Sequence, residues 1–132
     1  MNNKFKELLE KFKELNLPGG EYAIYGSGPL GVRDIRDVND LDIIVTDSLY
    51  QELKNKYNKD PEKERIKVGE IEIYPIWVWG PEFDGLEDSI KEAEIIDGLK
   101  FVNLSHLLKW KEKMGRPKDL KDIELINQYL KK

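Results

Sequence analysis

The chain has 132 residues, enough for one domain that builds its own core without disulfide support. It contains no cysteine and one histidine, His106, which excludes thiolate chemistry and argues against a histidine-based metal site. The net charge of −4 argues against a protein that holds DNA or RNA through bulk electrostatic attraction. The charged start does not resemble a signal peptide and no apolar run approaches about 20 residues, so we expect a cytoplasmic protein without membrane contact.

In the first half of the chain, the apolar pattern predicts helices that alternate with strands. The predicted elements are a helix over residues 3–15, a strand over 22–25, a short helix over 30–36 and a strand over 41–45. A tight loop over residues 26–29 is expected to connect the first strand to the short helix. Ser48 is expected to cap a third helix.

The second half begins with a predicted hairpin, residues 65–68 and 70–76, which turns at Gly69. Pro75 predicts that the far end of the second strand lies at the edge of the sheet or leaves it. The segments that follow are predicted as a loop over 80–85, a short helix over 86–93 and two short strands on either side of residues 97–98.

Two helices are predicted at the end of the chain. Ser105 is expected to cap the first, and residues 115–117 break it. Lys118 or Asp119 is expected to open the second, whose apolar residues recur at helical spacing: Leu120, Ile123, Ile126 and Leu130. The mixed order of elements predicts a single α+β domain over residues 1–132, with a small mixed β-sheet flanked by helices.

Two aspartates at the start of the strand over residues 41–45 are the first candidates for chemistry. Because side chains alternate along a strand, Asp40 and Asp42 are expected on one face, while Leu41, Ile43 and Val45 face the core. Two carboxylates side by side repel each other unless a cation lies between them. Their oxygen ligands suit magnesium or manganese, which also bind substrate phosphates.

The turn formed by Gly26 and Ser27, one strand earlier, predicts a phosphate-binding loop. Glycine lets a backbone approach a ligand closely, and exposed N–H groups at such a turn hold phosphate oxygens. The hydroxyl of Ser27 adds a further donor. The phosphate loop and the metal carboxylates are therefore expected at adjacent strand ends.

These residues resemble the signature of the nucleotidyltransferase superfamily. That signature is a hydrophobic residue, Gly, then Gly or Ser, a variable gap, and then Asp, hydrophobic, Asp or Glu, hydrophobic. Here Tyr25, Gly26 and Ser27 are followed by a gap of twelve residues, 28 to 39, and by Asp-Leu-Asp-Ile at 40–43.

The resemblance also implies a nucleotidyltransferase-like fold with a third carboxylate on a later strand. Glu72 is the candidate and Glu70 is the competitor, because both are expected on one face of the second hairpin strand. Residues 107–126 resemble the closing helices of small bacterial and archaeal members of the superfamily.

The implied reaction moves a nucleoside monophosphate from a nucleoside triphosphate, such as ATP, to a hydroxyl group and releases pyrophosphate. Asp40, Asp42 and Glu72 would be catalytic and hold two magnesium ions, while Gly26 and Ser27 would bind the triphosphate. The acceptor would be a protein side chain, a small molecule or, less favoured by the net charge, an RNA end. The modest size favours a protein partner or an oligomer that completes the site. The alternative is a catalytically degenerate module that binds nucleotide or a partner protein.

Several other side chains have both a functional and a structural interpretation. Two arginines would contact phosphates or pair with neighbouring aspartates: Arg33 and Arg36. Basic residues near the end of the chain would reach a triphosphate or form a solvated face: Lys109, Lys113, Arg116 and Lys118. The tryptophans would stack on a nucleobase or pack in the core: Trp77, Trp79 and Trp110. The sequence offers no partner for His106.

Overall fold

The computed structural model describes residues 1–80 and 85–132, and this part of the chain forms one six-stranded sheet in the order β3-β4-β2-β1-β6-β5. The strands are β1 (Tyr22–Tyr25), β2 (Leu41–Val45), β3 (Ile66–Val68), β4 (Ile71–Pro75), β5 (Glu94–Ile96) and β6 (Leu99–Phe101). The sheet is mixed, because β1 is antiparallel to β2 and parallel to β6, while β2 is parallel to β4.

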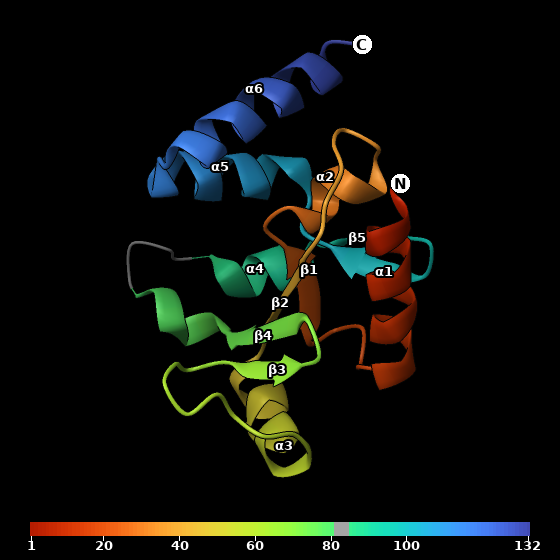
Figure 1. Ribbon diagram of the computed structural model, residues 1–132. Coiled ribbons are helices and arrows are strands. Elements are labelled where there is room, and N and C mark those ends of the chain that lie inside the picture. Colours follow the sequence, from red (N-terminus) through yellow and green to blue (C-terminus); the bar gives the residue numbers. More distant parts are fainter. Residues whose placement is uncertain (81–84) are drawn as a thin grey trace.

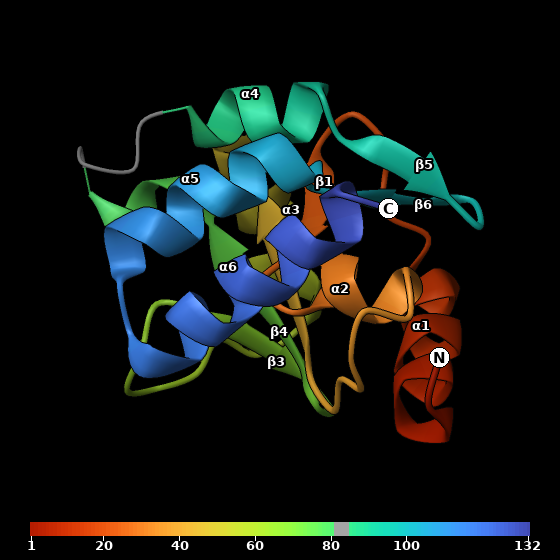
Figure 2. The same ribbon diagram turned by 90° about the horizontal axis from the view of Figure 1, so that it is seen from above.

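Helices cover both faces of this sheet. They are α1 (Asn3–Leu15), α2 (Gly28–Val32), α3 (Asp47–Lys56), α4 (Leu86–Lys91), α5 (Leu104–Met114) and α6 (Pro117–Leu130), with a 3₁₀ helix, η1 (Ile76–Trp79), after β4. One core contains residues of α1 and α3, and a second contains residues of α4, α5 and α6. Figure 1 shows α3 below the sheet with α5 and α6 above it, and Figure 2 shows α5 and α6 side by side. The predicted α+β class is confirmed.

The central strand β2 connects the two cores through the alternation of its side chains. Leu41, Ile43 and Val45 belong to the core that includes α1 and α3, whereas Ile44 belongs to the core on the other face. Asp42 therefore shares the face of Ile44, below α5 and α6. This arrangement follows the predicted alternation and places the acidic start of β2 next to the last two helices.

Two predicted helix caps are wrong, and the reason is the same in both. Thr46, rather than Ser48, caps α3 by accepting a hydrogen bond from the backbone N–H of Leu49. Asn103, rather than Ser105, caps α5 by accepting one from the N–H of His106. In each case the residue that caps the helix lies two positions before the predicted serine. Its backbone is extended because the chain has just left a strand at that point.

The boundaries of two helices also differ from the predicted ones. The short helix α2 begins at Gly28 rather than at residue 30, because Pro29 fits the first turn of a helix, where its missing N–H costs nothing. The last helix begins at Pro117 for the same reason, with Arg116 before it, rather than at Lys118 or Asp119. The predicted loop over 26–29 includes Pro29 and the predicted break over 115–117 includes Pro117, whereas Pro29 is the second residue of α2 and Pro117 the first of α6.

The hairpin of β3 and β4 turns at Gly69, as predicted, with a positive φ of 62°. Strand β4 ends at Pro75 and continues into η1, so its end leaves the sheet. The far end of β4 also lies at an edge, as predicted: Pro75 pairs with Val45 of β2, whereas β3 pairs only with Ile71–Ile73 of β4. Most of the loop predicted over 80–85 falls on residues 81–84, outside the described residues.

The apolar stripe of α6 is only partly buried. Ile126 is fully buried, whereas Leu120 and Leu130 are 59% and 55% exposed. The helix therefore packs on the rest of the molecule through a narrower face than its sequence pattern predicts. Within residues 1–80 and 85–132, none of the helices combines the length and apolar character needed to cross a membrane.

Candidate functional site

Three neighbouring strands bring the predicted site residues into one cavity of about 300 Å³. The register pairs Tyr25 at the end of β1 with Asp42 in β2, and Asp42 with Glu72 in β4. The turn after β1 therefore lies beside the two acidic strands. All five predicted residues line this cavity: Gly26, Ser27, Asp40, Asp42 and Glu72.

Gly26 lets the turn lie directly against the carboxylate of Asp42. Its φ is +67°, a left-handed conformation that side chains with a Cβ rarely adopt, and a Cβ added there would lie 3.3 Å from Asp42 Oδ2. Both the backbone conformation and the space beside Asp42 thus favour glycine. The close approach places backbone atoms of the turn within reach of any ligand of Asp42.

Gly26→Ala is expected to weaken ligand binding beyond its effect on stability. The left-handed backbone should cost about 1 kcal/mol of unfolding free energy, measured by denaturant titration. Gly69→Ala is the matched control, since Gly69 has a φ of +62° but no atom within 4 Å of an added Cβ. We expect similar losses of stability in both variants and weaker magnesium-dependent nucleotide binding only in Gly26→Ala. Equal binding by the two variants would contradict the role given to this close approach.

The carboxylate of Asp42 lies in an unfavourable environment for a negative charge. Its Oδ1 is buried and has no hydrogen-bond partner within the described part of the chain. Burial, followed by the charge of Asp40 and the neighbouring carboxyl of Glu72, raises its pKa from 3.8 to about 7, against a small opposing effect of Lys118. Asp40, in contrast, is exposed at the rim. A cation bound between these carboxylates would relieve both the repulsion and the unsatisfied oxygen.

Of the two candidates for the third carboxylate, the geometry favours Glu72. Glu70 lies in the hairpin turn and forms an ion pair with Lys4 of α1, away from the cavity. Glu72 lines the cavity but pairs with Arg65, which also donates to Asp60 Oδ2 at 2.9 Å. Among residues 1–80 and 85–132, no group of three His, Cys, Asp or Glu side chains is arranged to hold a metal ion.

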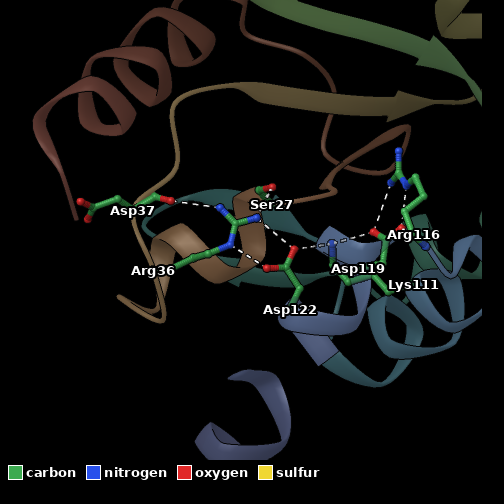
Figure 3. Close-up of polar contacts among 7 residues, drawn as sticks. All are labelled: Ser27, Arg36, Asp37, Lys111, Arg116, Asp119 and Asp122. Atoms are coloured by element: carbon green, nitrogen blue, oxygen red, sulfur yellow. Dashed lines mark hydrogen bonds and ion pairs between the residues drawn. The ribbon is translucent and has the colours of Figure 1, made fainter. Parts of the chain in front are cut away.

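A partly buried polar network connects the Ser27 turn to the last two helices (Figure 3). Arg36 donates to Ser27 Oγ at 2.8 Å and to both carboxylate oxygens of Asp122, at 2.7 and 2.9 Å. Lys111 donates to the same Asp122 at 2.9 Å and lies 3.7 Å from Asp119. Arg36 therefore pairs with Asp122 of α6. The sequence suggested an ion pair with Asp34 or Asp37, but Arg36 donates to the backbone oxygen of Asp37 and not to its carboxylate.

Each charged member of this network pairs with an opposite charge. Lys111, Asp119 and Asp122 have side chains that are 3%, 1% and 5% exposed. Burial alone would raise the pKa of Asp122, but hydrogen bonds from Arg36 and Lys111 outweigh it and lower the pKa. Arg116 lowers the pKa of Asp119 in the same way. The network fixes α5 and α6 above the cavity, and its long-range pairs carry no signal in the sequence.

Asp122→Asn is expected to destabilise the protein by about 2–4 kcal/mol, because the buried Lys111 would keep only Asp119 as an anionic partner. Glu124→Gln, an exposed change on the same helix, should cost little. The folded-state pKa of Asp122 lies below its unfolded value of 3.8, so its stabilisation is present above that pH and lost as the pH falls through the folded-state pKa. Urea titrations between pH 3 and 7 measure both effects. An Asp122→Asn protein as stable as Glu124→Gln would show that the network contributes nothing.

Other sequence candidates fall into two groups. Trp79, Trp110, Arg116 and Lys118 line the same cavity as the carboxylates. Trp77 does not: it is 50% exposed and donates to Asp47 at the start of α3.

Two candidates pair away from the cavity. Arg33 forms an ion pair with Glu94. His106 has two partners that the sequence did not indicate: Ser89 Oγ lies 2.9 Å from its Nδ1, and Glu92 contacts its Nε2.

The chain was also compared with known proteins, and no family model, curated protein or solved structure matched it. The inference of function consequently depends on the cavity itself: its carboxylates, its glycine-serine turn and the side chains around them.

Proposed function

We propose that this protein is a metal-dependent nucleotidyltransferase with a nucleotidyltransferase-like fold. One observation carries the proposal: Gly26, Ser27, Asp40, Asp42 and Glu72, chosen from the sequence pattern, line a single cavity. Within this cavity, one oxygen of Asp42 is buried without a hydrogen-bond partner among the described residues, beside the two further acids Asp40 and Glu72.

The chemistry of the donor set fits magnesium, provided that Glu72 exchanges its contact with Arg65. The set consists of carboxylate oxygens, the ligands that hard divalent cations prefer, and Asp42 Oδ1 lacks any partner among the described residues. Asp40, Asp42 and Glu72 would hold the two ions. Bound magnesium would supply charge neutralisation for the phosphates and for the entering and leaving oxygens.

The chain's own residues would position the triphosphate and the acceptor. Ser27 Oγ accepts a hydrogen bond from Arg36, so its own hydrogen remains available to donate to a phosphate oxygen. Arg116 and Lys118, at the cavity wall, would attract the phosphates. The acceptor hydroxyl would attack the α-phosphorus, the bond to the β-phosphate would break, and pyrophosphate would leave. Glu72 would accept the hydroxyl proton after exchanging its contact with Arg65.

A nucleotide-binding module without turnover is the second candidate, and the Arg65–Glu72 ion pair favours it. If that pair persisted with ligand bound, the third carboxylate would not reach the reacting atoms. Binding would then survive through Asp40 and Asp42 while the transfer step would fail.

Calorimetric titration with ATP, GTP, CTP and UTP, with and without magnesium, tests the site. We expect binding that requires magnesium. A protein that binds none of the four nucleotides in the presence of magnesium would contradict both candidates.

Labelled nucleotides separate the two candidates. With an α-³²P nucleotide, transfer leaves the label on the acceptor, which includes the protein itself or an added hydroxyl compound, whereas a γ-³²P label leaves with pyrophosphate. Magnesium-dependent binding without release of labelled pyrophosphate would support the binding module instead.

A further inference from the structure

We propose that the aromatic wall of the cavity, centred on Trp79, is a stacking subsite for the nucleobase of the bound nucleotide. This inference rests on the proposed function and assigns a part of the cavity that the carboxylates and the turn do not use. Neither the signature residues nor the charged network explain why four large aromatic rings gather at this position.

The rings form one connected cluster. Tyr25 is at its centre, with ring centroids 5.2 Å from Trp79, 5.3 Å from Trp110 and 6.3 Å from Tyr74. Trp79 also lies 5.3 Å from Tyr74 and 6.1 Å from Trp110. Most of these contacts are edge-to-face, an arrangement that attracts rings and holds them in fixed orientations. The wall is therefore already formed before a ligand binds.

The backbone places this wall beside the reactive carboxylates. Tyr25 immediately precedes Gly26 and is paired with Asp42 across β1 and β2. Trp79 ends η1, the 3₁₀ helix that continues from β4, the strand of Glu72. Trp79 and Trp110 are half-buried and line the cavity, whereas Tyr25 behind them is 7% exposed. Trp79 and Trp110 also pack against the second core, so a ligand would contact the part of each ring that faces the cavity.

The cavity has two chemically different parts that match the two parts of a nucleotide. Its charged part contains Asp40, Asp42 and the basic side chains Arg116 and Lys118, suited to a magnesium-bound triphosphate. Its aromatic part offers flat, uncharged surface, suited to a nucleobase, which presents a π-face whatever its identity. Triphosphate in the charged part would direct the base towards Trp79.

Trp77 provides a matched control for Trp79. It belongs to the same short helix, η1, but is exposed, donates to Asp47 and does not line the cavity. Trp79→Ala is expected to weaken magnesium-ATP binding about tenfold or more, the effect of losing one base–aromatic stack. Its affinity for magnesium-tripolyphosphate, which has no base, should be unchanged. Trp77→Ala should bind both ligands as the wild type does.

Calorimetry with both ligands on the three proteins separates failure of this subsite from failure of the proposed function. Equal ATP affinity in wild type and Trp79→Ala, or wild-type protein that binds tripolyphosphate as tightly as ATP, would overturn the stacking subsite alone. Wild-type protein that binds neither ligand would overturn the proposed function and the subsite with it.

A second measurement covers the case in which Trp79→Ala does not fold. In a Trp77→Phe protein, the two remaining tryptophans are Trp79 and Trp110, both in the cavity wall. Magnesium-ATP should then quench the intrinsic fluorescence, while magnesium-tripolyphosphate should not. Identical quenching by the two ligands would contradict contact between the base and these rings.

Discussion

Replacing Asp40 and Asp42 with asparagine is expected to abolish magnesium-dependent nucleotide binding while the fold remains intact. The two carboxylates share one strand face and one cavity, and neither contributes to the apolar cores. Asparagine keeps the side-chain shape but removes the charge that attracts a divalent cation. We expect the affinity to fall on the order of 100-fold or more, since loss of even a supporting group around a metal costs about 10–100-fold.

The control for this double variant changes the net charge equally at positions away from the cavity. Glu52→Gln with Glu124→Gln alters two exposed helical carboxylates and should bind magnesium-ATP as the wild type does. Circular dichroism checks that all three proteins are folded. Unchanged nucleotide affinity in the Asp40→Asn, Asp42→Asn protein would exclude these residues as the metal site.

Asp42→Asn alone is expected to make the ligand-free protein more stable at neutral pH. Burial and the charges of Asp40 and Glu72 raise the pKa of Asp42 to about 7 in the folded state, from 3.8 in the unfolded chain. A difference of about 3 pKa units sets a ceiling of about 4 kcal/mol on the cost of the charged form, and we expect a gain of about 1–3 kcal/mol. The gain would arise because a functional site keeps unfavourable charge that the fold alone does not need.

The stability difference between Asp42→Asn and the wild type should depend on pH. A folded-state pKa above the unfolded value means that the folded protein binds the proton more tightly, so Asp42 costs no stability below about pH 4. The cost grows as the pH rises to about 7 and is constant above that. Urea titrations with EDTA should therefore show the variant and the wild type alike near pH 4 and separating towards pH 7.

Magnesium with nucleotide should reverse the order, because it would stabilise the wild type alone. An Asp42→Asn protein that is less stable than the wild type at pH 7 in EDTA would mean that this carboxylate supports the fold.

The residues of the proposed site could be selected from the sequence because the pattern that points to them is local. Strand alternation places Asp40 and Asp42 on one face, and the chain positions of Gly26 and Ser27 follow from the end of a short buried strand. Short apolar runs and the alternation along the second hairpin strand likewise predicted strands of the sheet. The sequence named Glu72 as the candidate with Glu70 as its competitor, and the register that pairs Asp42 with Glu72 across β2 and β4, which the sequence does not give, favours that choice.

Features that depend on distant parts of the chain were not predictable. The ion pair of Arg36 with Asp122 joins residues that are 86 positions apart. Each of them has oppositely charged residues much nearer in the sequence. Ser48 and Ser105 have the chemistry of helix caps, but the direction of the chain as it leaves the sheet makes Thr46 and Asn103 the caps instead.

Anomalous diffraction from crystals grown with manganese and a non-hydrolysable ATP analogue would test the metal site most directly. Manganese has the same preference for oxygen ligands as magnesium and gives an anomalous signal. We predict a manganese peak in contact with the carboxylates of Asp40 and Asp42, with the analogue's phosphates beside Ser27. Bound analogue with no manganese at these aspartates, or with manganese held elsewhere, would contradict the site at its centre.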